Sequence, residues 1–317
     1  METLQQLQLT EFGSTEVLTL SSVTDSPLGP NQVRVRGAYA SVNPIDVKTR
    51  AGLGWAAQAN ADKLPWTLGY DYSGQITEIG DQVTDLQIGD YVCGLIGFPL
   101  IAGAYSQSVI SDQDDWHVVS GSHLIQAAAL PLAGLTAWQA LFEHTSVTEN
   151  SRVLILAAAG GVGHIAVQIA KNAGAWVAGT SSESNLDFIQ SLGCDLAIDY
   201  KNTDAWKELQ PVDVLIDLVG GNAGLEALAF VKPDGVALTV PTISKDAFIE
   251  KATSLGLDAT GMLMHASREQ MQALLSQLNQ EQLSIHVSAS YMLNQGALAH
   301  QQLETGHTRG KVLLELA

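Results

Sequence analysis

The chain has 317 residues, of which 46% are hydrophobic and only 15% are charged. This length allows two domains that each bury a core, and the composition is that of a globular protein rather than a disordered one. Lys and Arg number 15 against 33 Asp and Glu, which gives a formal net charge of −18. A field of that sign repels phosphate backbones, so we expect no nucleic acid among the partners.

The two cysteines, Cys93 and Cys194, lie far apart in the sequence. They are too few for a disulfide framework or for a cysteine-rich zinc lobe, and we expect both to be reduced, buried thiols. Residues 1–6 hold no basic segment followed by an apolar one, and no run is apolar enough to span a bilayer. We therefore expect a cytoplasmic protein that has no membrane partner.

The first third of the chain has the pattern of short strands and turns. Residues 32–36 alternate with period two, and residues 74–81 read as a strand that ends in a Gly-Asp turn signal. Residues 88–94 form a turn that leads into another strand. Helical patterns are few in this region, so the sequence predicts a partly closed β-barrel.

From about residue 124 onward, short apolar runs alternate with helical stretches, the first of which is a helix of small residues at 135–141. The predicted strands are residues 153–157, 176–180, 196–200, 212–218 and 236–240. Continuous apolar strands that are separated by amphipathic helices are typical of a parallel sheet covered on both faces. This pattern indicates a doubly wound α/β domain.

The last part of the chain returns to the first pattern, with no repeat and no low-complexity linker. The expected elements are a strand at 285–292, a helix near 296–303 and a closing strand at 311–316. We therefore predict that the chain leaves the barrel, builds the α/β domain and comes back. The predicted boundaries place residues 1–123 and 285–317 in the barrel domain and residues 124–284 in the α/β domain.

The most informative segment is residues 156–166, LAAAGGVGHIA. It matches G-x-G-x-x-G with Ala158 in the first glycine position, and it lies between an apolar strand and a helix, as the motif requires. Gly160 would let the backbone approach a diphosphate, and Gly163 would let the helix lie close to its strand. The amides expected to bind the phosphates at the positive end of the helix dipole are those of Ala159, Gly160, Gly161 and Val162.

The helix after this turn is recognisable by one apolar face, which runs from Val162 to Ala173 with a 3.6-residue period. Gly174 is a suitable residue just past the end of the helix. We expect His164, at the helix start, to be solvated or to pack rather than to act as a base. The alternative for the glycines is that they only make a tight turn between strand and helix.

The end of the second strand bears on the choice between NADPH and NADH. An acidic side chain there would bind the adenosine ribose and favour NADH, but this chain has Ser181 and Ser182. Both hydroxyl groups can donate to a 2′-phosphate, so we expect NADPH, with NADH as the alternative. Glu183 would repel that phosphate if it pointed inward; otherwise it is a solvated acid near a helix start.

Several further motifs occur in order along nearly the whole chain. They are SVNPID at 41–46, LGYDYSG at 68–74, GDYV at 89–92, LTAW at 135–138 and GKVL at 310–313. Together with the Ala-Ala-Gly-Gly-Val-Gly turn, they resemble the medium-chain dehydrogenase/reductase superfamily, and within it the zinc-free quinone oxidoreductase branch. The resemblance implies a GroES-like substrate domain made from both chain ends and a Rossmann domain between them.

By the same resemblance, zinc-dependent relatives have a cysteine where this chain has Asn43, a histidine where it has Tyr70 and a cysteine near Leu132. An amide, a phenol and a hydrocarbon cannot form a zinc site, and the histidines include no H-x₃-H pair. The sequence therefore predicts an enzyme without a metal site.

The resemblance also implies roles for residues in both domains. Asn43 is expected near the nicotinamide and the substrate carbonyl. The other residues expected at the cofactor are Thr136 near the carboxamide, Tyr200 beside the adenosine phosphate, the backbone at Val219 and Val240, and Lys311 near the nicotinamide end. One departure bears on NADPH, because relatives that use it often carry Lys or Arg after the second strand, where residues 183–185 read Glu-Ser-Asn.

Some of these residues have a purely structural alternative. Asn43, which precedes a proline, is also a typical turn residue, and Tyr70 can be a half-buried packing residue. Tyr200 can be an ordinary aromatic residue at a strand end. We expect Asp46 and Lys48 only to pair on the surface.

The predicted chemistry follows from the lack of a Lewis acid, which disfavours simple alcohol oxidation because nothing would stabilise an alkoxide. We expect NADPH-dependent hydride transfer to quinones or α,β-unsaturated carbonyls, whose conjugation spreads the incoming charge. Asn43 would donate a hydrogen bond to the enolate oxygen, and the proton would come from Tyr70 or from water.

Two other functions stay open at this point. One is a protein that binds NAD(P)H in a structural or regulatory role with little turnover, and the other is a zinc alcohol dehydrogenase with unusual ligands. By resemblance we also expect a homodimer, formed through an edge strand at residues 260–265.

Overall fold

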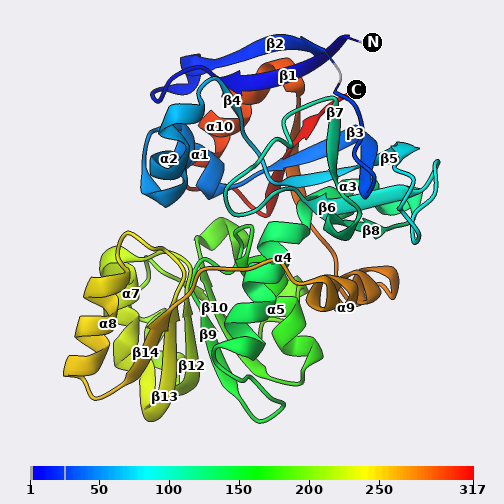
Figure 1. Ribbon diagram of the computed structural model, residues 1–317. Coiled ribbons are helices and arrows are strands. Elements are labelled where there is room, and N and C mark those ends of the chain that lie inside the picture. The colour runs from blue at the N-terminus through cyan, green and yellow to red at the C-terminus, as the bar shows by residue number, and fades with distance from the viewer. Residues whose placement is uncertain (1–2, 25) are drawn as a thin grey trace. The chain divides into compact units, whose positions relative to one another are not determined.

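The computed structural model describes residues 3–24 and 26–317. Residues 1, 2 and 25, which belong to the predicted barrel domain, lie outside the described residues. The chain divides into two compact units, and each has its own core (Figure 1). The first unit comprises Met1–Leu132, His265–Leu275 and Ile285–Ala317, and the second comprises Ala133–Met264 and Ser276–Ser284.

The first unit is built on a seven-stranded sheet with the order β15-β16-β3-β5-β6-β8, to which β7 is added by pairing with β3. Its strands are β3 (Gln32–Val42), β5 (Asp71–Ile79), β6 (Tyr91–Leu95), β7 (Ser108–Asp112), β8 (Trp116–Val118), β15 (Val287–Met292) and β16 (Lys311–Glu315). A second sheet has the order β2-β1-β4 and consists of β1 (Thr3–Leu9), β2 (Leu18–Thr24) and β4 (Trp66–Thr67). The three strands predicted in the first third of the chain correspond to β3, β5 and β6.

The C-terminal strand completes this unit. Strand β16 pairs antiparallel with β3, with Val312 opposite Val42, and Figure 1 shows it in red beside the blue β3. Tyr72 and Trp116 pack edge to face in the core, with ring centroids 6.0 Å apart. A Cβ at Gly37 would lie 2.2 Å from the Tyr72 hydroxyl, so any side chain at this point of β3 would require the buried Tyr72 to move.

The helices of the first unit are short, and several of them flank the sheet. They are α1 (Pro44–Arg50), α2 (Gly54–Asn60), α3 (Leu124–Ala129) and α10 (Gly296–Glu304). Two further helices, α4 (Pro131–Trp138) and α9 (Arg268–Asn279), contribute residues to both units. The single-turn 3₁₀ segments of the chain are η1 (Thr15–Val17), η2 (Ala61–Lys63), η3 (Gln113–Asp115), η4 (Gly121–His123), η6 (Glu183–Asn185), η7 (Ala205–Glu208), η8 (Leu228–Phe230) and η9 (Leu293–Gln295).

The second unit contains a six-stranded parallel sheet with the order β11-β10-β9-β12-β13-β14. The strands are β9 (Arg152–Ile155), β10 (Trp176–Ser181), β11 (Leu196–Asp199), β12 (Val212–Asp217), β13 (Val231–Thr239) and β14 (Asp258–Gly261), and the helices between them are α5 (Gly163–Asn172), α6 (Leu186–Ser191), α7 (Gly221–Ala227) and α8 (Lys245–Ser254). The chain winds outward from β9 in one direction and from β12 in the other. Because parallel crossovers are right-handed, α5 and α6 cover one face and α7 and α8 the other (Figure 1). The predicted doubly wound sheet is confirmed.

Helix α5 differs from its prediction in one respect. All residues from Gly163 to Ala170 are buried, so the helix is covered on nearly every side rather than on one apolar face. The predicted end of the helix is confirmed, since Gly174 has a φ of +87°. His164 is fully buried, and its Nδ1 lies 2.8 Å from the Gly160 carbonyl oxygen. The expectation that it packs is therefore confirmed, and the alternative of a solvated side chain is wrong.

Other local expectations are confirmed or corrected. The helix expected at 135–141 is α4 followed by a π-helical turn, η5 (Gln139–Glu143). The edge strand expected at 260–265 ends at Gly261, so most of that range lies beyond β14. Both cysteines are free and buried, as predicted.

Within residues 3–24 and 26–317, no single helix has the length and apolar character needed to cross a membrane. One bent pair, Gly121–Ala129 with Pro131–Glu143, meets that test on length and composition alone.

Candidate functional site

The glycine-rich turn of the second unit follows β9 and leads into α5. The Ala157 amide donates to the Thr180 Oγ1 atom at 3.2 Å, and the Ala158 amide donates to the Thr180 carbonyl oxygen at 2.8 Å. These two bonds tie the turn to the end of β10. Ala157 has a φ of +51°, a left-handed conformation that a residue with a Cβ adopts only at a cost. The turn is thus held in one shape from outside.

The glycines of this turn have different structural roles. A Cβ at Gly163 would lie 2.2 Å from the Ala157 carbonyl oxygen, which confirms the expected close approach of helix and strand. A Cβ at Gly160 would meet only that oxygen, at 3.2 Å. Across the described residues, the amides of Gly161 and Val162 donate to no backbone carbonyl, and both residues are partly exposed. Amides of this kind at the positive end of a helix fit a bound phosphate.

The ends of β10 and β11 place the predicted adenosine-side residues next to each other. Ser181 is opposite Asp199 in the parallel register, and the Tyr200 amide donates to the Ser181 carbonyl oxygen at 3.1 Å. Ser181 is buried and its hydroxyl donates to the carbonyl of Ser182. The side chain of Tyr200 is 45% exposed. Of the two serines, Ser182 is therefore the one whose hydroxyl reaches the surface.

Asp217, at the end of β12, organises a part of the site that sequence reasoning missed. Its Oδ1 accepts hydrogen bonds from the amides of Val219 at 2.9 Å and Gly220 at 2.8 Å. Its Oδ2 accepts from the Thr239 hydroxyl at 2.8 Å, and its carbonyl oxygen from the Val240 amide at 2.9 Å. One buried carboxylate thus fixes both backbone segments that were predicted to line the cofactor cleft. The signal in the sequence was an acid at the end of an apolar strand.

The predicted cofactor residues of the second unit therefore share one location, with one exception. Those at 159–162, Ser181, Ser182, Tyr200, Val219 and Val240 lie at or just past the carboxyl ends of β9 to β13, where ligands of such sheets bind. Thr136 lies instead on α4, where it is buried.

In the first unit, Asn43, Asp71 and Lys311 form a buried polar cluster, which we call the amide cluster. Lys311 Nζ donates to Asn43 Oδ1 at 2.6 Å, and Asn43 Nδ2 donates to Asp71 Oδ2 at 2.9 Å and to the Ser41 carbonyl oxygen at 3.3 Å. Lys311 Nζ lies 3.6 Å from Asp71 Oδ2. The other carboxylate oxygen of Asp71 accepts from the Leu132 amide at 2.7 Å. The amide of Asn43 is therefore held between a cation and an anion.

The local chain explains where these groups come from. Asn43 directly follows β3 and is the N-cap of α1, which begins at Pro44 with the φ angle that a helix start needs. Lys311 begins β16, the neighbour of β3, and Asp71 begins β5 on the other side of β3. Burial raises the pKa of Asp71 and lowers that of Lys311, while the ion pair opposes both shifts.

A second series of buried hydrogen bonds adjoins the amide cluster. Asp46 Oδ2 accepts from the Asn43 backbone amide at 2.8 Å and from the Tyr105 hydroxyl at 3.1 Å, and that hydroxyl lies 3.2 Å from His300 Nε2. Burial raises the pKa of Asp46 to about 7 and lowers that of His300 to about 3. The expected surface pair of Asp46 with Lys48 is wrong, because Asp46 is fully buried. Its role at the third position of α1 was visible in the sequence as an N-terminal capping pattern.

Tyr70 is more enclosed than the half-buried alternative. Only 1% of its surface is exposed, its hydroxyl donates to the Pro99 carbonyl oxygen at 3.1 Å, and burial raises its pKa. Its ring packs edge to face against Phe98, with centroids 5.2 Å apart, and Phe98 in turn meets Trp55 at 6.3 Å. Phe98 and Trp55 are both partly exposed. These three rings form an aromatic cluster in the first unit.

The three residues that the resemblance places at zinc-ligand positions, Asn43, Tyr70 and Leu132, offer poor ligands for that metal. The side-chain oxygen of Asn43 already accepts a hydrogen bond from the Lys311 ammonium group, and the Tyr70 hydroxyl donates to the Pro99 carbonyl oxygen. The side chain of Leu132 has no atom that can bind a metal. In the part of the chain that the structure describes, no group of three or more His, Cys, Asp or Glu side chains can hold a metal ion.

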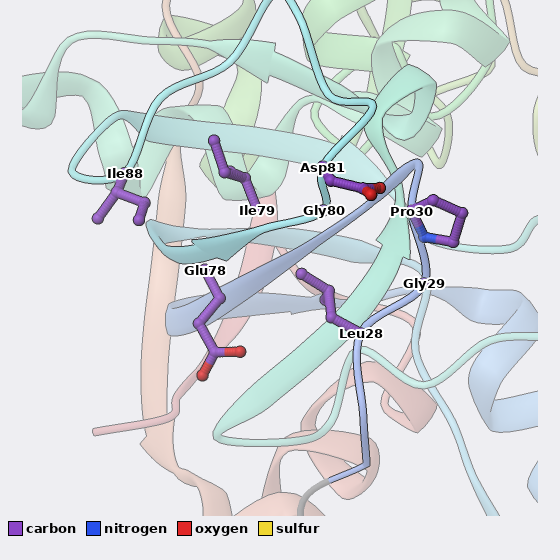
Figure 2. Close-up of a pocket in the computed structure, with 8 residues that line it drawn as sticks. All are labelled: Leu28, Gly29, Pro30, Glu78, Ile79, Gly80, Asp81 and Ile88. Carbon is purple, nitrogen blue, oxygen red and sulfur yellow. The ribbon is translucent and has the colours of Figure 1, made fainter.

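A separate pocket of about 540 Å³ lies in the first unit, where the chain before β3 meets the end of β5 (Figure 2). It is lined by Leu28, Gly29, Pro30, Glu78, Ile79, Gly80, Asp81 and Ile88. None of the predicted site residues is among them, so this pocket is not part of the candidate site.

Comparisons with known proteins agree with this arrangement. Two family models match the chain, an alcohol dehydrogenase GroES-like domain over residues 29–128 and a zinc-binding dehydrogenase over residues 192–314. A solved quinone oxidoreductase from Coxiella burnetii is 37% identical, with a TM-score of 0.94 over the full length of both chains. The Escherichia coli quinone oxidoreductase, solved with NADPH, is 25% identical, with a TM-score of 0.87 over 98% of this chain and 99% of its own. The 2-methylene-furan-3-one reductase of Solanum lycopersicum is 31% identical over 96% of this chain and 77% of its own length.

The turn before α5 gives a first prediction. Gly163→Ala is expected to lower the free energy of unfolding by about 1–3 kcal/mol, because the new methyl group has no space beside the Ala157 carbonyl. Gly160→Ala, the same change in the same turn, is expected to cost less than about 1 kcal/mol but to weaken NAD(P)H binding. Urea unfolding and titration with NADPH and NADH measure the two effects. Equal losses of stability in both variants would contradict this division of roles.

The raised pKa of Asp46 gives a second prediction. Its folded value of about 7 exceeds its ordinary value of 3.8, so the folded state binds this proton more tightly than the unfolded chain does. The stabilising contribution is full below about pH 4 and is lost as the pH rises toward 7. Asp46→Asn keeps an oxygen acceptor without this titration.

We therefore expect the free energy of unfolding of the Asp46→Asn variant to fall less between pH 4 and 7 than that of the unchanged protein. Urea unfolding at several pH values measures it, and the comparison cancels the titration of groups that both proteins share. Parallel pH profiles for the two proteins are incompatible with a raised pKa at Asp46.

Proposed function

We propose that this chain, which belongs to the medium-chain dehydrogenase/reductase superfamily and to its quinone oxidoreductase-like branch, uses NADPH to reduce quinones or α,β-unsaturated carbonyls without zinc. That it is an NAD(P)H-dependent oxidoreductase follows from its relatives, which are reductases of these kinds. The observation that carries the proposal of a zinc-free reductase is the amide cluster, in which the side-chain oxygen of Asn43 accepts from Lys311 and its side-chain nitrogen donates to Asp71.

The second unit supplies the residues that would hold the cofactor. The amides of the glycine-rich turn fit the diphosphate, and the groups at the ends of β10 and β11 fit the adenosine end. Asp217 keeps the backbone at Val219 and Val240 in place. When bound, the dihydronicotinamide supplies a hydride.

In the first unit, Asn43 would donate a hydrogen bond to the oxygen on which negative charge develops. The charged Lys311 polarises the amide through its oxygen, and this strengthens the amide N–H groups as donors. One N–H is bound firmly to Asp71, whereas the other makes only the long bond to the Ser41 carbonyl oxygen. A stronger acceptor that approaches this second N–H can displace its weak bond to the Ser41 carbonyl oxygen at low cost. A developing enolate is such an acceptor.

The remaining proton would come from Tyr70 or from water. The raised pKa keeps the Tyr70 phenol protonated, and its hydroxyl must leave the Pro99 carbonyl before it can donate elsewhere. The phenol is thus a weak acid that still offers a hydrogen bond.

The aromatic cluster supports a conjugated acceptor. Trp55 and Phe98 are partly exposed beside Tyr70. Exposed Leu53 caps the helix that carries Trp55, and exposed Leu100 and Ile101 closely follow Phe98. Flat, apolar molecules bind well to ring faces and edges of this kind. The partner that we propose is therefore a small conjugated carbonyl compound or quinone. Nucleic acid and membrane are not proposed as partners, and we propose a cytoplasmic location.

The assay that tests this function measures NADPH oxidation with a panel of quinones, enals and enones, after dialysis of the protein against a metal chelator. We expect turnover with at least one conjugated acceptor, no loss of activity on dialysis and less than stoichiometric zinc. Tight NADPH binding with no turnover across the panel would favour a structural or regulatory role, and stoichiometric zinc would revive a metal mechanism.

Two substitutions test the roles in the first unit. Asn43→Ala is expected to lower kcat on the order of 10²-fold, since it removes one donor to the developing oxyanion. Tyr70→Phe removes only the hydroxyl, so a lower kcat that depends on solvent deuteration would identify Tyr70 as the proton donor. If kcat is unchanged in Tyr70→Phe, water is the donor. An unchanged kcat in Asn43→Ala would contradict the role of the amide cluster.

We also propose a homodimer that forms through β14. Among residues 3–24 and 26–317, this strand pairs with β13 alone and lies at the edge of its sheet. Its outer side would pair with the same strand of a second copy. Thr260→Lys places a charge on this edge and is expected to weaken the dimer at least about tenfold. Thr253→Lys, the same change on the exposed side of α8, serves as the control.

Sedimentation equilibrium measures the mass in each case. A monomeric unchanged protein would refute the dimer, and equal dissociation constants for both variants would place the interface elsewhere.

A further inference from the structure

The cofactor proposal leaves one requirement unmet in the sequence. A 2′-phosphate carries a charge of about −1.5 to −2 near neutral pH, and its recognition calls for a cation. The segment after β10 offers Glu183, Ser184 and Asn185 instead, in a chain with more than twice as many acidic as basic residues. A cation must therefore reach the adenosine side from another element if NADPH is to be preferred.

The structure supplies such a cation at the end of β11. Ser181 of β10 and Asp199 of β11 are paired, and the Tyr200 amide holds the next residue against β10 through its bond to the Ser181 carbonyl. Lys201 follows directly, and its own amide donates to Asp199 Oδ1 at 3.1 Å. The backbone that carries Lys201 is thus fixed to the strand whose end was predicted to bind the phosphate.

The side chain of Lys201 lies against that of Tyr200. Its Nζ lies over the Tyr200 ring, 5.6 Å from the centroid, and both residues are exposed. A ring under an ammonium group restricts where the charge lies and keeps it close to Tyr200. Lysine and tyrosine therefore present a positive charge and a hydroxyl group from one point at the sheet edge.

Neutral hydrogen-bonding groups complete the arrangement on β10. Ser182 Oγ lies 3.2 Å from Ser184 Oγ and accepts a hydrogen bond from Asn185 Nδ2 at 3.2 Å. Two hydroxyl groups and an amide thus lie together in the segment that follows β10. They can orient a phosphate, but they cannot balance its charge.

We infer that Lys201 recognises the 2′-phosphate of NADPH, together with Ser182 and Tyr200, and so determines the preference for NADPH over NADH. This inference rests on the proposed function, because it concerns the cofactor of that same site. The positive charge that binds the phosphate then comes from the segment after β11, because the segment after β10 has none.

The test compares Lys201→Met with Lys207→Met. Lys207 lies in η7, six positions further along the chain, and is 77% exposed in an ion pair with Asp204 at 2.6 Å. Both variants lose one positive charge from the same surface region, so the net charge changes equally. Dissociation constants for NADPH, NADH and 2′,5′-ADP are measured at low and at moderate salt.

For Lys201→Met, we expect the dissociation constants of NADPH and 2′,5′-ADP to rise about tenfold or more. The dissociation constant for NADH is expected to stay within about twofold, and the salt dependence of NADPH binding is expected to decrease. Lys201→Arg is expected to retain the preference for NADPH, and Lys207→Met to leave all three constants unchanged. Equal weakening of NADPH and NADH, or identical effects of the two Met variants, would overturn the inference.

The test of Lys201 can fail or succeed independently of the test of the proposed reductase function. The compound 2′,5′-ADP carries the 2′-phosphate but no nicotinamide, so its binding does not depend on turnover. An unchanged protein that reduces enones but binds NADH as tightly as NADPH would overturn the role of Lys201 and leave the reductase intact. Conversely, if Lys201→Met weakens the binding of 2′,5′-ADP but the unchanged protein reduces no acceptor, the role of Lys201 stands and the proposed reductase function is wrong.

Discussion

The burial of charge beside Asn43 is the constraint on which the first unit depends. An ammonium group and a carboxylate removed from water are stable only if each finds a partner, and here Lys311 and Asp71 meet across the amide of Asn43. Lys311 and Asp71 begin β16 and β5, and Asn43 directly follows β3, the strand between them. The pairing of the C-terminal strand with β3 is therefore needed both for the sheet and for the polar cluster. A sheet that lacked β16 would leave Asp71 buried without its cation.

Local patterns in the sequence predicted most of the second unit. The strands alternate with helices in the chain itself, the glycine-rich turn carries its own signal, and Gly174 marks the end of α5 by its backbone requirement. What the sequence did not show is how deeply α5 is covered. Periodicity reports one apolar face, whereas His164 and Gln168 are polar and yet buried, because their side chains find backbone partners within the unit. Such partners are set by tertiary packing and leave no trace in a hydropathy pattern.

The candidate site was predictable where it rests on a motif and not where it rests on distant pairs. Asn43, Lys311 and the turn were found because each lies in a recognisable short segment. Asp46, Tyr105 and His300 come from three separate parts of the chain, and each looks like an ordinary surface or core residue by itself. Asp46 was even expected on the surface, although its position three residues after Asn43 fits a helix cap. Whether such an acid is buried depends on what packs above α1, which the local sequence does not specify.

The two units achieve precision by different means. In the second, the groups that would bind the diphosphate are backbone amides, and the backbone at the strand ends is positioned by a few buried side chains, Thr180 and Asp217 among them. In the glycine-rich turn itself, the requirements on side chains are therefore few: residue 163 must have none, and these two anchors must stay in place. In the first unit the groups are side chains that hold one another, so the identity of each one counts. A change at Asp71 alters the orientation of Asn43, and a change at Lys311 alters its polarity as a donor. Variation that preserves the fold is therefore far more restricted around Asn43 than around the glycine-rich turn.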